Sequence, residues 1–292
     1  TAIGFRCMYG NVGGMSGLYN TGMGVQTLYN QTTGTSNTGI GHAALVANTS
    51  GSYNTAIGGL DTGTYSVMAA NTTGSYNTAV GSGALKSNTS ASNNTAVGYQ
   101  AAYTNTTGIN NVAVGQEALK LNTTANNNTA VGYQAGISNT TGTANVIVGN
   151  QALYTNQTAS NNTAVGYQAA YSHNTSGNTN LTAIGRISLF SNTTGIQNTA
   201  VGNGALYSNT TANNNSAVGE SALYYNTTGA SNSALGQGAL QANTTASNNT
   251  AVGYQAAYTG TTASGIAAFG YRSLYLNTAN NNTAFGSDTL DR

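Results

Sequence analysis

Residues 198–219 read NTAVGNGALYSNTTANNNSAVG, and the last five residues of this stretch repeat the first five with Ser216 in place of threonine. The positions of Gly202 and Gly219 differ by 17, and closely similar units recur along most of the chain. A fixed period of this length is typical of a repeat fold in which successive units stack on one another. The period therefore predicts a fold of stacked repeats.

One glycine in each unit marks the period, and we call these residues the anchor glycines. They are Gly4, Gly24, Gly41, Gly58, Gly81, Gly98, Gly115, Gly132, Gly149, Gly166, Gly185, Gly202, Gly219, Gly236, Gly253, Gly270 and Gly286. Most of the gaps between successive anchors equal the 17-residue period, and four gaps differ from it. The pattern predicts a single repeat domain over 1–292, with an irregular first coil at 1–23. Regular coils follow at 24–290, with an insertion at 59–76.

Each unit divides into two short apolar pieces separated by polar corners. The first piece is Thr95-Ala96-Val97 in one unit, and the second is Ala205-Leu206-Tyr207 in another. The corners resemble Asn192-Thr193-Thr194-Gly195, in which asparagine and glycine favour turns. Both pieces are too short and too rich in flanking glycine for stable helices. We expect two short strands per coil, stacked on their equivalents in the next coil.

The sequence thus predicts an all-β fold, a parallel β-solenoid or β-roll of about 17 coils with 17 residues each. The composition fits this prediction, because 47 Thr, 43 Asn and 39 Gly make up 129 of the 292 residues. Stacking places equivalent residues above one another, so a repeated charge would repel its neighbours. Asparagine and threonine can instead form hydrogen-bonded ladders. Only 4% of the residues are charged, and proline, which would remove a ladder donor, is absent.

The same numbers weigh against several classes of function. Six basic and five acidic residues give a net charge of +1, which is too little for a nucleic-acid-binding surface. No apolar run approaches the ~20 residues of a membrane-spanning helix, so we expect no membrane insertion. Cys7 is the only cysteine and has no internal disulfide partner.

Catalysis and cofactor binding are not expected either. The acidic residues are scattered along the chain at Asp61, Glu117, Glu220, Asp288 and Asp291. Glu117 and Glu220 occupy equivalent positions in coils six repeats apart, too far for a carboxylate pair. His42 and His173 have no acidic or cysteine neighbour in equivalent coils, so neither suggests a triad or a metal site. We expect no enzyme, no cofactor and no metal.

The segments NNTAVGYQAAY (93–103) and NTAVGNGALY (198–207) resemble the head repeats of YadA-type trimeric autotransporter adhesins and of tail-fibre-like surface proteins. The resemblance covers nearly all of 24–290. It implies a left-handed β-roll in a homotrimer outside the cell, used for attachment or as a rigid spacer. It also implies that the small strand face contacts partner chains, at Ala96, Ala130, Ala164, Ala200 and Ala251. The head repeat of that family is shorter than the unit found here, and the stalk and membrane anchor are not found in this sequence.

The Asn-Thr-Thr corners suggest a site of glycosylation, because many Asn-x-Ser/Thr tripeptides fall on the same corner of the coil. The candidate asparagines are Asn71, Asn105, Asn122, Asn139, Asn192, Asn209, Asn226 and Asn243. The candidate threonines are Thr107, Thr124, Thr141, Thr194, Thr211, Thr228 and Thr245. Either N-linked or O-linked sugars would help to keep a nearly uncharged surface dispersed.

These features favour an extracellular structural fibre at a cell or virion surface, with the chain itself as its partner. Because the chain opens and closes within repeats, we expect either a segment of a longer protein or a head-to-tail polymer. The alternative is a recognition solenoid that binds carbohydrate or ice through its threonine and asparagine ladders. The Thr pairs lie in predicted turns rather than on a flat strand face, which makes the fibre the favoured function.

Overall fold

The computed structural model describes residues 1–10, 15–59 and 65–290. These residues form two compact units, Thr1–Asn145 and Val146–Arg292, and each unit is a parallel β-solenoid with no helix in its described part. The predicted fold class is confirmed. Asp61 and Asp291 lie outside the described residues, as does the centre of the predicted insertion at 59–76.

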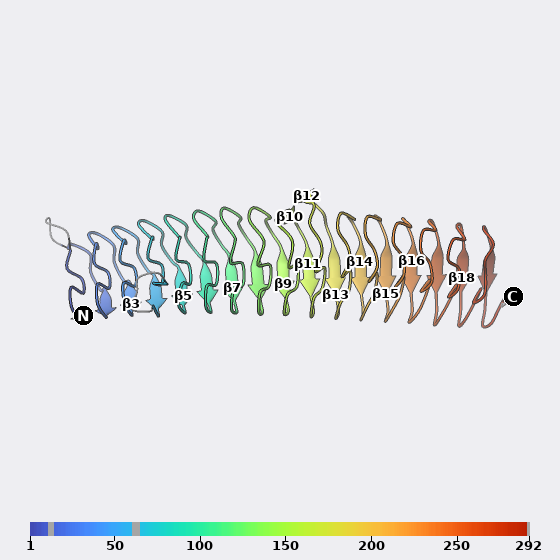
Figure 1. The fold of residues 1–292 in the computed structure, drawn as a ribbon, viewed down its shortest axis with the longest axis horizontal. Coiled ribbons are helices and arrows are strands. Elements are labelled where there is room, and N and C mark those ends of the chain that lie inside the picture. Colours follow the sequence, from blue (N-terminus) through green and yellow to red (C-terminus); the bar gives the residue numbers. More distant parts are fainter. Residues whose placement is uncertain (11–14, 60–64, 291–292) are drawn as a thin grey trace. The chain divides into compact units, whose positions relative to one another are not determined.

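The first unit contains one short strand per coil, and these strands stack in parallel (Figure 1). They are β1 (Ala2–Ile3), β2 (Thr21–Met23), β3 (Thr38–Ile40), β4 (Thr55–Ile57), β5 (Thr78–Val80), β6 (Thr95–Val97), β7 (Val112–Val114) and β8 (Thr129–Val131). Equivalent residues pair in every step. Ala56 lies opposite Ala79, for example, although the insertion lies between them in the sequence.

The second unit repeats this arrangement. Its main sheet consists of β9 (Val146–Val148), β11 (Thr163–Val165), β13 (Thr182–Ile184), β14 (Thr199–Val201), β15 (Ser216–Val218), β16 (Ser233–Leu235), β17 (Thr250–Val252), β18 (Ala267–Phe269) and β19 (Thr283–Phe285). Two further strands, β10 (Thr158–Ser160) and β12 (Ser176–Asn178), pair with each other at the corner of two coils.

The anchor glycines end the strands, as the period predicted. All 17 have positive φ, between +122° and +139°, a region that other residues rarely adopt. Close approach of the next coil adds a second requirement. A Cβ atom on Gly202 would lie 2.5 Å from the carbonyl oxygen of Gly219. Only glycine satisfies both demands at this position.

The prediction of a second strand in each coil is wrong. Ala205, Leu206 and Tyr207 lie in a turn, and Leu206 has a φ of +51°. Alternate residues with positive φ reverse the direction of the chain within a single coil. The backbone amides of this segment still donate hydrogen bonds to the coils before and after it. The amide of Gly204 donates to Arg186 O in the preceding coil, and the amide of Leu206 donates to Ala222 O in the following coil. This segment is therefore bonded to its neighbours without being a β-strand.

The prediction of which strand side chains face outwards is also wrong. Ala96, Ala130, Ala164, Ala200 and Ala251 were expected to face partner chains, but all five are completely buried inside the coil. The core is narrow, because the strand alanines pack in the same interior as Leu206 and its buried equivalents. Consequently the branched residues point outwards, and Ile184, Val218 and Leu235 are 39%, 37% and 51% exposed.

Candidate functional surfaces

Two ladders of asparagine side chains run through the interior of each unit. The first is the corner ladder, which contains all eight asparagines predicted as glycosylation candidates. The amide of Asn209 donates from Nδ2 to Asn192 Oδ1 at 2.7 Å and to Ala212 O at 3.1 Å. Asn226 Nδ2 donates in turn to Asn209 Oδ1 at 3.0 Å. The predicted amide ladder is confirmed.

The second ladder lies just before each strand. Asn215 donates from its backbone amide to Asn198 Oδ1 at 2.9 Å, and from Nδ2 to Gly229 O at 2.9 Å. Asn232 makes the same two contacts one coil later. Together the two ladders satisfy buried carbonyl groups that a purely apolar core would leave without partners.

N-linked glycosylation of the eight candidate asparagines is incompatible with this arrangement. Asn71, Asn105, Asn122, Asn139, Asn192, Asn209, Asn226 and Asn243 are at most 1% exposed. An N-glycan is attached through Nδ2, which in each of these residues donates hydrogen bonds inside the coil. The turn composition predicted where these residues lie along the chain, but it did not predict which way they point.

The two threonines after each corner asparagine differ in hydrogen bonding. The first of them binds the next coil, as in Thr210, whose Oγ1 donates to Thr227 O at 3.1 Å. The second is exposed, and its hydroxyl makes no hydrogen bond to the described part of the chain. This outer threonine column consists of Thr73 and the seven predicted candidates, Thr107, Thr124, Thr141, Thr194, Thr211, Thr228 and Thr245.

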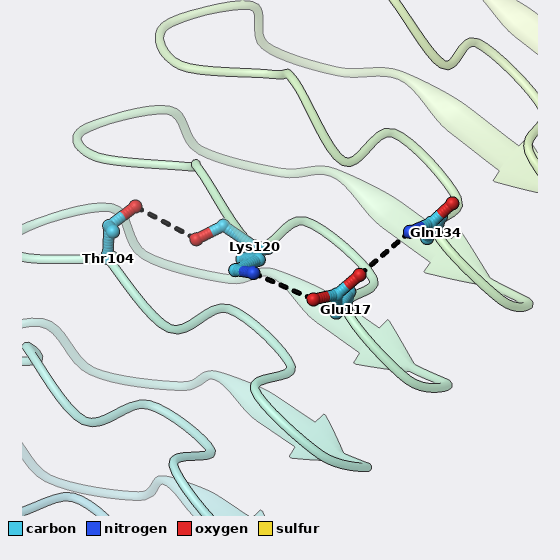
Figure 2. A network of polar contacts seen from close by, with 4 residues as sticks. All are labelled: Thr104, Glu117, Lys120 and Gln134. Atoms are coloured by element: carbon cyan, nitrogen blue, oxygen red, sulfur yellow. Dashed lines mark hydrogen bonds and ion pairs between the residues drawn. The ribbon is translucent and has the colours of Figure 1, made fainter. Parts of the chain in front are cut away.

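Glu117 makes two close side-chain contacts (Figure 2). Its Oε1 lies 2.7 Å from Lys120 Nζ, and its Oε2 accepts a hydrogen bond from Gln134 Nε2 at 2.8 Å. The bonds from Gln134 and Lys120 hold the pKa of the Glu117 carboxyl below its ordinary value. A carboxylate held in this way is a weak base, so the geometry gives no support to a catalytic role.

Metal binding finds no support in the described part of the chain, where no three His, Cys, Asp or Glu side chains are grouped for it. His173 takes the place of an asparagine in the corner ladder. Its Nδ1 lies 2.9 Å from Asn192 Nδ2, while Nε2 is buried without a partner among the described residues. Burial lowers the pKa of His173 to about 4. The position of His173 in the repeat is the sequence feature that indicates this structural role.

The outer face of the strands is a further candidate surface. Along β14, for example, Thr199 and Val201 are half-buried on the outside while Ala200 is buried between them. None of the described strands in either main sheet contains a charged residue. In the second unit a stack of aromatic rings runs elsewhere on the coil, through Tyr154, Tyr171, Phe190, Tyr207 and Tyr224 at centroid distances of 4.9–5.3 Å.

Comparison of the chain with protein-family models, with curated proteins and with solved structures found no match. A search of the described residues found no helix of the length and hydropathy needed to cross a bilayer.

Proposed function

We propose that this chain is a subunit of an extracellular structural fibre. The observation that carries the proposal is the repeated bonding along each unit, in which strand pairs, backbone bonds and two buried asparagine ladders join successive coils. Each coil contacts mainly its neighbours, so stability accumulates along one dimension. A repetitive scaffold that keeps its polar groups bonded to itself is suited to a mechanical task.

The proposed fibre assembles from copies of the chain, side by side, head to tail or both. The exposed strand face supports lateral contact, because it is uncharged and displays branched apolar residues such as Ile184 and Leu235. A trimer like that of the adhesin head repeats is one form of this assembly.

Electron microscopy of the protein from its natural source tests the proposal. We expect rods on the surface of intact cells or virions, labelled by an antibody without permeabilisation. Aligned rods should give a meridional reflection at ~4.8 Å, the spacing of paired strands. Isolated globular particles, or labelling that requires permeabilisation, would contradict the fibre and its location respectively.

A second candidate function is surface recognition of carbohydrate or ice, and the strand face is the observation that favours it. Its threonines stack outside the sheet in successive coils, as Thr182 and Thr199 do. Thermal hysteresis or glycan-array binding by the isolated chain would support this function. We expect Thr182→Lys with Thr199→Lys to abolish either activity, and Thr211→Lys, at the corner of the coil, to leave it intact.

A further inference from the structure

We propose that the outer threonine column is a site of O-linked glycosylation. The proposal goes beyond the fibre function and does not depend on assembly, because it concerns the surface of a single chain. Three consecutive polar residues at one corner, such as Asn209, Thr210 and Thr211, differ in the hydrogen bonds of their side chains.

Hydrogen bonding leaves only the last of these three side chains free for modification. Asn209 is buried and its Nδ2 has two acceptors, as described above. Thr210 Oγ1 donates to Thr227 O in the next coil, a bond that attachment of a sugar to this oxygen would remove. Loss of a hydrogen bond of this kind weakens the contact between coils, more so if the carbonyl is left without another partner. Thr211 is exposed, and modifying its hydroxyl breaks no contact with the described residues.

The group-transfer step needs only a free hydroxyl and an activated sugar. A glycosyltransferase would bring a nucleoside-diphosphate sugar to the corner, where Thr211 Oγ1 attacks the anomeric carbon. The new bond is the C–O glycosidic bond, and the bond that breaks joins the anomeric carbon to the nucleoside diphosphate. The hydroxyl proton passes to the base of the transferase.

Charge repulsion favours a neutral sugar over a phosphoryl group at these positions. Successive hydroxyls of the column are one coil apart, or ~4.8 Å at the spacing of paired strands. This separation is shorter than the Debye length of about 8 Å at physiological ionic strength. Phosphoryl groups with about −1.5 to −2 charges each would therefore repel one another along the column. Neutral sugars would hydrate the corner without such repulsion in a chain with 4% charged residues.

Thr158 supplies an internal control. It occupies the same position of the repeat as Thr141 in the coil before it, and it is also exposed. Its Oγ1, however, donates to Thr175 O at 3.2 Å, beside the pairing of β10 with β12. We therefore expect Thr158 to stay unmodified, although sequence and exposure alone would place it with the others.

The test is site mapping by mass spectrometry on protein from its natural source, digested with a protease of broad specificity. We expect hexose or hexosamine masses on the outer threonine column. Thr193, Thr210, Thr227 and Thr158 should carry none, and neither should the eight corner asparagines. Alkaline β-elimination should release the sugars, and peptide N-glycosidase should not.

Two variants produced in the source organism sharpen the mapping. Thr211→Ala should remove one glycan mass from the intact protein, and Thr158→Ala should remove none. Bare peptide masses, sugars on asparagine, phosphate on the column, or equal modification of Thr210 and Thr158 would each overturn the proposal. Rods that are bare would overturn glycosylation alone, while globular particles with sugars would overturn only the fibre.

Discussion

At the scale of single residues, a buried asparagine amide in this protein stabilises the fold by hydrogen-bonding one coil to the next. Asn209 joins the coils on either side of it and closes its own turn, and the same contacts recur at Asn226. Positions where another residue replaces the ladder asparagine therefore show what the amide contributes. His173 and Gly260 are two such positions in the second unit.

His173 should make the protein sensitive to acid. Its pKa is about 4 in the folded chain, against 6.5 for an ordinary histidine, so the unfolded chain binds a proton first as the pH falls. Stability is complete above pH 6.5 and falls towards pH 4, by about 3 kcal/mol in total. We expect His173→Asn, which restores the ladder residue, to remove this dependence. Urea denaturation of both proteins at neutral pH and near the folded-state pKa measures it, and equal losses would contradict the assignment.

Gly260 interrupts the corner ladder, and filling the gap should stabilise the second unit. Asn243 Oδ1 is buried without a partner among the described residues, and the next coil has Gly260 where an asparagine usually lies. Gly260→Asn should supply the missing donor and add about 1 kcal/mol to the free energy of unfolding.

Gly260→Ala is the control for this substitution, because it restricts the unfolded backbone by a similar amount without adding an amide. Protection of nearby amides from hydrogen exchange should rise more for asparagine than for alanine. The same increase in both variants would show that Asn243 gains no bond.

At the scale of the element, the residues with positive φ determine the backbone path of each coil. Gly236 has a φ of +135°, and a Cβ atom there would lie 2.4 Å from Gly253 O, a backbone atom. Two positions later, Gly238 has a φ of +65° and its nearest neighbours are side chains. Gln255 occupies the equivalent position in the next coil with a φ of +50°.

We therefore expect Gly236→Ala and Gly238→Gln to differ sharply within one coil. The first should cost about 3 kcal/mol or more, because backbone strain and a backbone clash act together. Hydrogen exchange should show lost protection in β16 and β17. The second should change stability by less than about 1 kcal/mol. Similar losses for both would contradict the distinction between the two glycines.

The strands and their anchor glycines were predictable from the sequence, but the rest of the coil was not. Alternation in Thr199-Ala200-Val201 shows that Ala200 faces one side and its neighbours the other, without saying which side is the interior. The narrow core leaves room only for alanine on the strand. This conclusion requires knowing that Leu206 lies inside the coil. Leu206 itself adopts a positive φ that its residue type disfavours, so local propensity predicted a strand there.

The candidate surface was predicted in position but not in role. Turn propensity placed asparagine and threonine at one corner, yet it treats both as solvent-exposed residues. Which side chain is buried depends on hydrogen bonds to the next coil, such as that from Asn226 to Asn209. Such contacts join residues a full repeat apart in the chain, beyond the reach of local propensity.

At the scale of the whole molecule, ionic interactions contribute little. The described residues contain two ion pairs, Lys120–Glu117 and Arg272–Asp288, and the second spans 3.9 Å. Surface pairs of this kind contribute about 0–1 kcal/mol each. Stability rests instead on hydrogen bonds and burial, which are much less sensitive to screening by salt.

Stability should therefore be nearly independent of ionic strength. We expect the free energy of unfolding at neutral pH to change by less than about 1 kcal/mol between low and high concentrations of sodium chloride. Urea denaturation at the two salt concentrations measures it. A large loss of stability at high salt would indicate that charge pairs hold the coils together.

The constant pairing of equivalent residues, as in Ala200 with Ala217 and Ala217 with Ala234, has a consequence for the gene. Unequal recombination that shifts two copies by one repeat adds or removes a complete coil. The neighbours of the new coil present the same partners as before, so no compensating mutation is required. The number of coils is thus a trait that can vary between related lineages while the design of each coil stays the same.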